Sequence, residues 1–177
     1  MNNTSEINYE ILIKEQKTTK PIIEDIIDKF LEGDKLKNAM DFIAFLRDNN
    51  MNPRWHSANS WRVVGKKGKG VCRIDLGGTK NAWHKHFGVG DWQISDLGGL
   101  ERKYLDEFIS NDEIKEFVWA NIRPCVRCCS CGPRSHDYIG KRFDESCGFI
   151  VKNPDVKGVQ IVKKLVETNK RHIYENA

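Results

Sequence analysis

The side chains with the greatest chemical potential in this sequence are cysteines gathered in one short segment. Four of the six cysteines fall within the run PCVRCCSCGPR, and a fifth follows in DESCG. Thiolates bind zinc and other soft metals, act as nucleophiles in redox chemistry, and form disulfides. The density of thiols therefore predicts metal binding or thiol chemistry rather than packing alone.

The spacing of these cysteines favours one tetrahedral zinc site. Cys128 and Cys131 have two residues between them and Gly132 after them, a form in which one tight turn supplies two thiolates and its amides point at sulfur. Cys125 lies one turn upstream, and Cys147 arrives 16 residues after Cys131, again followed by a glycine. We predict that structural zinc is held by Cys125, Cys128, Cys131 and Cys147.

Other ligand sets and other chemistries fit the same segment. Cys129 could replace Cys128, and His136 could replace Cys147. The thiols could instead be free and redox-active, with the vicinal pair Cys128 and Cys129 as the reactive element, or form disulfides or an iron–sulfur site. Neighbouring arginines would favour thiolates, which helps metal binding and thiol reactivity equally: Arg123, Arg127 and Arg134.

Tryptophan and histidine side chains form a second block in the middle of the chain. A concave sheet face lined by aromatic rings would make a ligand pocket. The residues that we predict for such a pocket are Trp55, Trp61, Trp83, His84, His86 and Trp92. The alternatives are that the tryptophans are core residues and the histidines loop residues, or that exposed rings stack on nucleic-acid bases.

Charge is distributed unevenly along the chain. Residues 1–50 carry seven basic and ten acidic side chains, so a net charge of +4 for the whole chain leaves +7 on the remainder. The remainder includes a lysine cluster at 65–70 and several arginines near the cysteines, and such basic clusters attract phosphate. A nucleic-acid-binding protein is therefore an alternative interpretation, and it would use the arginines near the cysteines together with Lys66, Lys67 and Lys69.

Apolar periodicity predicts the elements that must position these residues. Helical spacing is expected over 21–31, 34–48, 100–108 and 112–118, and strand spacing over 61–63, 71–76, 91–97, 138–143 and 149–152. Residues 1–18 carry little pattern and are expected to form a loosely docked arm. The glycine- and lysine-rich stretch 65–70 predicts a hairpin turn.

The last helix has the clearest signals. Asn153 is expected to be its N-cap and Pro154 its first residue. Its apolar stripe consists of Val159, Val162, Leu165 and Val166.

These elements predict an α+β fold, with N-terminal helices packed on an antiparallel sheet, a zinc-stabilised cysteine segment and a closing helix. The expected division is a helix-and-sheet body over residues 1–120 and a cysteine-rich unit with the final helix over 121–177, packed together as one globular unit. No stretch approaches the roughly 20 apolar residues that a membrane span requires, and no signal peptide is evident. We therefore expect a cytoplasmic protein that does not use membranes, and the Lys, Asn and Ile content suggests a bacterial gene.

Two stretches of the sequence resemble known proteins. The segment DNNMNP, followed by WRVV and GVCRI, resembles the central part of small uncharacterised bacterial proteins. The later segments IGKRF, Cys147 and NPD are similar to their C-terminal part, so the resemblance spans about residues 35–172. The central sheet also resembles the YdhG and YjbR-like α+β domains of bacteria, which lack the cysteine segment. Neither resemblance implies an assigned activity or a catalytic residue.

The sequence contains no recognised constellation for catalysis. It has no His-Glu-x-x-His motif, no phosphate-binding loop before a helix and no Gly-x-Ser-x-Gly elbow. The leading interpretation is a non-enzymatic binding module with a structural zinc site, whose ligand is a small molecule or a macromolecule. The alternatives are a thiol-based metal or redox sensor and a nucleic-acid-binding protein.

Overall fold

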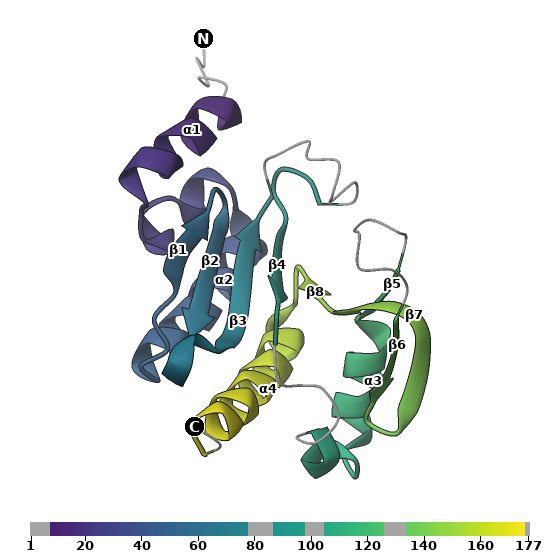
Figure 1. The fold of residues 1–177 in the computed structure, drawn as a ribbon. Coiled ribbons are helices and arrows are strands. Elements are labelled where there is room, and N and C mark those ends of the chain that lie inside the picture. The colour runs from purple at the N-terminus through teal and green to yellow at the C-terminus, as the bar shows by residue number, and fades with distance from the viewer. Residues whose placement is uncertain (1–7, 78–86, 98–104, 126–133, 176–177) are drawn as a thin grey trace.

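The protein folds as an α+β structure, and its described residues form four α-helices and two antiparallel sheets (Figure 1). The computed structural model describes residues 8–77, 87–97, 105–125 and 134–175. The helices in these ranges are α1 (Tyr9–Thr19), α2 (Gly33–Asp48), α3 (Asp112–Ala120) and α4 (Val156–Glu175). The predicted fold class is confirmed, whereas the zinc in that prediction stays a prediction.

The larger sheet has the strand order β1-β2-β3-β4-β8, and the smaller has the order β5-β7-β6. The strands of the larger sheet are β1 (Arg54–Ser57), β2 (Ser60–Val64), β3 (Gly70–Leu76), β4 (Trp92–Ser95) and β8 (Val151–Lys152). Those of the smaller sheet are β5 (Ile122–Pro124), β6 (Arg134–Tyr138) and β7 (Lys141–Phe149). Only Ile150 separates β7 from β8, so the chain passes directly from one sheet to the other.

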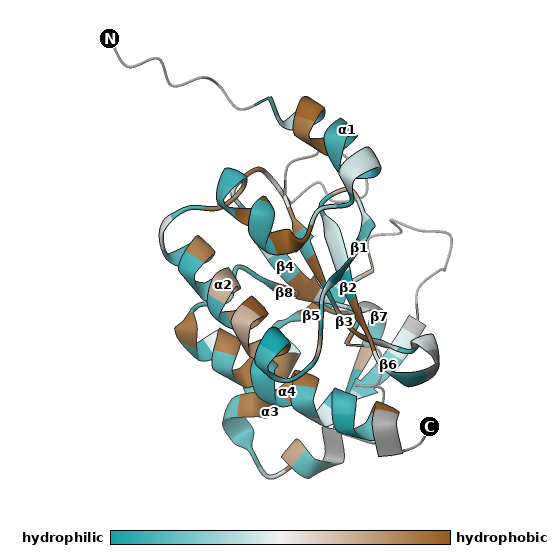
Figure 2. Ribbon diagram, turned by 90° about the vertical axis from the view of Figure 1, so that its left-hand side faces the viewer, coloured by the Kyte–Doolittle hydropathy of each residue, from teal (hydrophilic) through white to brown (hydrophobic). Residues whose placement is uncertain are grey.

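The larger sheet has one apolar and one polar face, as strict alternation in antiparallel strands requires. Neighbouring strands align Trp61, Ile74, Ile94 and Val151 in one row, and all four are buried. Helices α2 and α4 lie on one side of this sheet (Figure 2). The Phe42 ring of α2 packs 6.3 Å from the Trp92 ring, which identifies the helix-covered side as the apolar face.

The opposite row is polar. Ser60, Asp75, Gln93 and Lys152 are register partners across β2, β3, β4 and β8. The Ser60 and Gln93 side chains both donate hydrogen bonds to the Asp75 carboxylate. The polar face therefore carries an organised network rather than scattered charges.

Four predicted elements match the structure closely. The 65–70 stretch forms the β2–β3 hairpin, where a 3-10 turn, η3 (Lys66–Gly68), lies at the tip. The predicted strand at 91–97 is β4, and the predicted helix at 112–118 is α3. All four stripe residues of the last helix are buried: Val159, Val162, Leu165 and Val166.

The helix predicted over residues 21–31 is wrong. The chain there forms two 3-10 turns, η1 (Ile23–Asp25) and η2 (Ile27–Lys29). β-Branched side chains lose rotamer freedom in a helix, so this isoleucine-rich run has little intrinsic helical preference. Its apolar periodicity reports burial, because Ile23, Ile27 and Phe30 all enter the core.

The start of the last helix is also corrected. The Oδ1 atom of Asp155 accepts a hydrogen bond from the Gly158 amide at 2.7 Å, so Asp155 is the N-cap. Asn153 instead adopts a left-handed backbone with φ of 44°. Its side chain accepts from the Trp92 amide at 2.8 Å and donates to Asp91 at 2.7 Å, which ties the helix entry to β4.

Helix α1 occupies part of the N-terminal arm for which the sequence showed little pattern. Asn8 caps it by accepting from the Glu10 and Ile11 amides. Its single fully buried side chain is Gln16, so its sequence carries almost no apolar stripe. The Gln16 amide donates to Asn59 Oδ1 at 2.6 Å and accepts from the Asn59 amide at 2.7 Å, which fastens α1 to the β1–β2 turn.

The Gln16 contact predicts a measurable stability change. Replacing Gln16 by Ala leaves the buried Asn59 N–H without its acceptor, and we expect a loss of about 1–2 kcal/mol in the free energy of unfolding. Urea denaturation measures this loss. Gln160→Ala, on an exposed position of α4, is the matched control and should change stability by less than about 0.5 kcal/mol. Equal effects of the two substitutions would contradict the anchoring role of Gln16.

No helix in the described ranges is long and apolar enough to cross a membrane.

Candidate functional site

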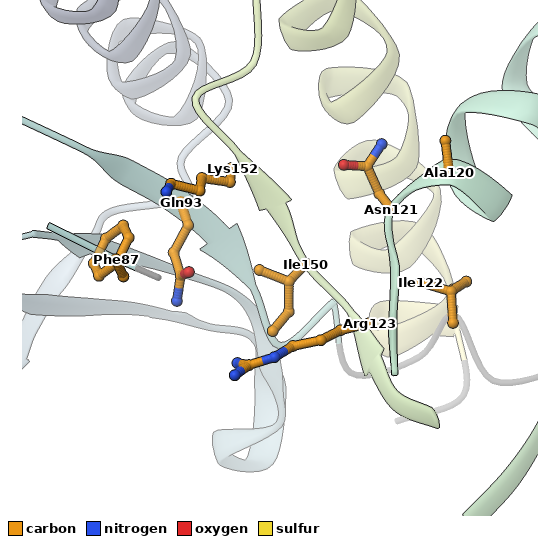
Figure 3. Close-up of a pocket in the computed structure, with 8 residues that line it drawn as sticks. All are labelled: Phe87, Gln93, Ala120, Asn121, Ile122, Arg123, Ile150 and Lys152. Atoms are coloured by element: carbon orange, nitrogen blue, oxygen red, sulfur yellow. The ribbon is translucent and has the colours of Figure 1, made fainter. Parts of the chain in front are cut away.

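A cavity of about 210 Å³ lies where the two sheets meet (Figure 3). Its walls come from β4, β8, β5 and the end of α3. The lining residues are Phe87, Gln93, Ala120, Asn121, Ile122, Arg123, Ile150 and Lys152. Apolar carbon therefore surrounds a small set of polar groups, which is the usual composition of a ligand pocket.

Arg123 supplies the cationic group of this cavity. It lies on β5, where its backbone is paired with Gly148 of β7. Its half-buried side chain extends from the strand toward the Gln93 side of the cavity (Figure 3). Within the described part of the chain, the guanidinium has no carboxylate or hydrogen-bond partner. A bound anion could therefore use all of its donors.

Gln93 is held in one orientation by Asp75. Its Nε2 atom lies 3.0 Å from Asp75 Oδ2, and an ionised carboxylate can only accept, so the atom facing Asp75 is the amide nitrogen. Ser60 and Arg73 also donate to Asp75, at 2.6 and 3.1 Å. The Gln93 side chain is 4% exposed, and its carbonyl oxygen is the end turned away from Asp75.

The orientation of the Asn121 side-chain amide also follows from a hydrogen bond of its nitrogen. Its side-chain nitrogen donates to the Phe117 carbonyl at 2.8 Å, which identifies the oxygen as the remaining end of that amide. Its backbone carbonyl accepts from the Ile150 amide at 3.0 Å, so it also joins the end of α3 to the β7–β8 connection. The cavity wall thus presents two oriented amide oxygens, from Gln93 and Asn121.

Lys152 is engaged with a neighbouring carboxylate. Its Nζ lies 2.9 Å from Asp91 Oδ2, while Lys35 of α2 lies 3.1 Å from Asp91 Oδ1. Burial would raise the pKa of Asp91, but hydrogen bonds from Lys152, Asn153, the Gly88 amide and Lys35 outweigh burial and hold that pKa well below its usual range. Asp91 is therefore ionised at neutral pH and offsets one of the two lysines.

The smaller sheet brings the ends of the cysteine segment together. Pro124 at the end of β5 and Arg134 at the start of β6 are both register partners of Ser146 on the central strand β7. The Cys125 amide donates to the Glu145 carbonyl, and Cys147 is the next residue after Ser146. The backbone of Cys125, the residue that follows β5, therefore lies next to β7, the strand that carries Cys147.

The remaining predicted metal ligands are only partly visible. Cys128, Cys129 and Cys131 lie outside the described residues, as does the side chain of Cys147. Within the described ranges, no group of three or more His, Cys, Asp or Glu side chains could hold a metal. His136 is opposite Phe143 in the β6–β7 ladder, and its ring lies 6.0 Å from the Tyr138 ring.

None of the three described tryptophans of the predicted pocket lines the cavity in Figure 3. Trp61 and Trp92 are fully buried on the apolar face, where their rings pack in the core. Trp55 is partly buried, and its ring lies 5.9 Å from the ammonium of Lys20. Three further predicted pocket residues lie outside the described residues: Trp83, His84 and His86.

No sequence pattern identified the residues that line the cavity. Gln93, Asn121 and Lys152 belong to no motif, and Arg123 was considered only as a neighbour of the thiols. The cavity arises from the meeting of β4 and β8 with β5, segments separated by up to 60 residues, whereas sequence patterns report local periodicity.

Comparison with known proteins gives no family for this chain. No protein-family model matches it, and neither a curated protein nor a solved structure matches it. The resemblance to small bacterial proteins and to YdhG and YjbR-like domains therefore stays a prediction. The function has to be argued from the cavity and the cysteine-bearing sheet.

Proposed function

We propose that this protein is a non-enzymatic binding module that takes a small organic acid in the cavity between its two sheets. The observation that carries this proposal is the Arg123 guanidinium, which reaches into the cavity without a partner among the described residues. Arginine binds carboxylates through two parallel hydrogen bonds in a planar geometry. Partial burial strengthens that pairing relative to water.

The rest of the lining supports an acid of modest size. Ile122, Ile150 and Phe87 offer apolar contact for a hydrocarbon body. A volume of about 210 Å³ corresponds to roughly seven water molecules at about 30 Å³ each. Drug-sized pockets begin near about 300 Å³, so the cavity suits a ligand smaller than those.

A binding role rather than catalysis fits the chemistry of the lining. Amide groups and a guanidinium orient ligands, but they are poor nucleophiles and poor general bases at neutral pH, and the remaining polar group, the Lys152 ammonium, is paired with Asp91 at 2.9 Å. The described lining residues include no Ser, Cys, His, Asp or Glu. The ordered amides therefore serve recognition.

Substitution of Arg123 tests this proposal. Wild-type protein is titrated with 4-methylpentanoate, benzoate and phenylacetate, and binding is followed by amide chemical shifts. We expect at least one acid to bind and Arg123→Gln to weaken it about 10- to 100-fold, because charge-assisted hydrogen bonds are worth about 1.5–3 kcal/mol. Arg142→Gln, an exposed arginine on β7 of the same sheet, is the matched control and should bind normally. Binding of none of these acids, or equal binding by both variants, would refute the proposal.

We further propose that the cysteine segment holds a structural zinc ion through Cys125, Cys128, Cys131 and Cys147. The support comes from the smaller sheet, where both ends of the segment pair with Ser146. The Ser146 side chain is 4% exposed, and its hydroxyl has no hydrogen-bond partner among the described residues. A buried hydroxyl beside Cys147 fits a site in which O–H groups donate to thiolate sulfur.

Zinc in this position would act as a scaffold. Two ends of a loop and the central strand of a small sheet are the segments that one tetrahedral ion can hold together. The smaller sheet also carries Arg123, so a firm sheet keeps the pocket cation in place.

A further inference from the structure

We infer that the ligand is a hydroxy acid: a small carboxylic acid that also carries a hydroxyl group. This inference rests on the proposed binding function and specifies the ligand class for the same cavity. It follows from the polar atoms that remain available once every internal hydrogen bond of the wall is assigned.

The wall offers acceptors as well as a cation. The nitrogens of Gln93 and Asn121 are committed to Asp75 and to the Phe117 carbonyl, at 3.0 and 2.8 Å. The side-chain oxygen is therefore the end of each amide that is left for a ligand. Neither oxygen has a hydrogen-bond partner in the described part of the chain. A ligand that brings only a carboxylate would satisfy Arg123 and leave these oxygens unpaired.

The missing group is consequently a donor. Burying an amide oxygen without a donor loses its hydrogen bond to water, and Gln93 is 96% buried. Inorganic phosphate keeps an O–H donor at neutral pH but has no apolar body for the Ile150 and Phe87 side chains, and ionised phosphate esters are chiefly acceptors. A ligand hydroxyl or single N–H can donate to one of the two oxygens, and the Gln93 oxygen belongs to the more buried residue, whereas an ammonium could donate to both.

Charge favours the hydroxyl over an ammonium. Among the described charged groups around the cavity, Lys35 and Lys152 bind Asp91, Arg73 is paired with Asp75 and Asp96, and Arg123 is a further cation. These described groups are four cations and three carboxylates, so their sum is +1, which disfavours an added ammonium and attracts a carboxylate. A neutral donor combined with one carboxylate matches the Gln93 acceptor and this charge.

The experiment compares ligands that differ in one group. The probes are 4-methylpentanoate, 2-hydroxy-4-methylpentanoate, leucine and inorganic phosphate, titrated against the whole wild-type protein by calorimetry. We expect the hydroxy acid to bind about 3- to 10-fold more tightly than the parent acid, which corresponds to one neutral hydrogen bond. Leucine and phosphate should bind more weakly than the hydroxy acid.

A variant of Gln93 assigns the gain to its oxygen. Gln93→Met keeps the length of the side chain and removes the amide, so the ratio of hydroxy-acid affinity to parent-acid affinity should fall from about 3–10 to about 1, whatever change in affinity the two acids share. The ligand comparison on wild-type protein stands even if this variant folds poorly.

The outcomes separate the two proposals. If the parent acid binds as tightly as the hydroxy acid and Arg123→Gln weakens both, the binding function holds and the hydroxy-acid inference is overturned. If leucine binds best, an amino acid is the ligand and the inference is overturned. If no probe depends on Arg123, the binding function itself fails.

Discussion

Replacing Asp91 by Asn is expected to lower the free energy of unfolding by about 2–3 kcal/mol. The carboxylate receives hydrogen bonds from four groups: Lys35 and Lys152, the Asn153 side chain and the Gly88 amide. An amide at this position keeps one acceptor oxygen and turns an N–H₂ group toward other donors. Because both lysines are partly exposed, water compensates some of the loss, and the estimate stays below the sum of four such bonds.

The effect is large because Asp91 joins separate elements. Lys35 belongs to α2, Lys152 to β8, and Asn153 to the turn that enters α4. The same turn supplies the amide acceptor for Trp92 on β4. Loss of the carboxylate therefore loosens the edge of the larger sheet that also forms one wall of the cavity.

Lowering the pH should reproduce part of this loss of unfolding free energy in the wild-type protein, because acid protonates Asp91. The pKa of Asp91 is well below its usual range in the folded state, so its contribution to stability is present above the unfolded value of about 3.9. It is lost as pH falls through the lowered folded value. Urea denaturation at pH 7 and at pH 3 should show a smaller fall in stability for Asp91→Asn than for wild type.

The control for Asp91 is another carboxylate on the same side of the molecule. Asp41 of α2 is half exposed and, among the described residues, pairs with Lys163 alone, at 2.8 Å. Asp41→Asn should cost less than about 1 kcal/mol, as exposed pairs do. If both variants lose the same stability at pH 7, Asp91 is an ordinary surface carboxylate and the expectation is wrong.

Turn residues and apolar periodicity, which are local features of the sequence, correctly predict the β2–β3 hairpin and helix α4. Glycine and lysine between two alternating runs marked the β2–β3 hairpin, and a stripe of four apolar residues marked α4. The strand predicted over 138–143 is wrong, because residues 139 and 140 form the turn between β6 and β7. Ile139 and Gly140 both have positive φ and form the turn, and a β-branched residue in that conformation is one that sequence rules discourage.

The candidate site depended on contacts that no local pattern records. Asn153 was expected to cap a helix, yet its side chain binds β4 and Asp91 across the fold. Arg123 was considered with the thiols because it is near them in the sequence, while its guanidinium reaches the junction of the two sheets. The number and spacing of the cysteines predict metal or thiol chemistry, which stays a prediction. The cavity forms only when β8 packs against β4, which no local sequence pattern indicates.

Removal of the proposed zinc is expected to lower the free energy of unfolding more than Asp91→Asn does, because the ion would hold the smaller sheet together. Purified wild-type protein should contain one zinc ion per chain by elemental analysis, and Cys147→Ser should contain far less. We expect that variant to lose about 3–5 kcal/mol of stability, because zinc binding contributes directly to folding in structural sites. A strong chelator should lower the wild-type melting temperature and leave Cys147→Ser unchanged.

Cys72 provides the matched control for this experiment. It is fully buried on β3, and burial raises the pKa of its thiol, so it stays a neutral core residue rather than a metal ligand. Cys72→Ala should lose about 1–2 kcal/mol through its small cavity and keep the full zinc content. Thiol titration then distinguishes the two kinds of cysteine site. Structural zinc predicts that the clustered thiols react only after chelation. Clustered thiols that react at once in a metal-free protein would overturn the zinc proposal and favour a thiol-based sensor.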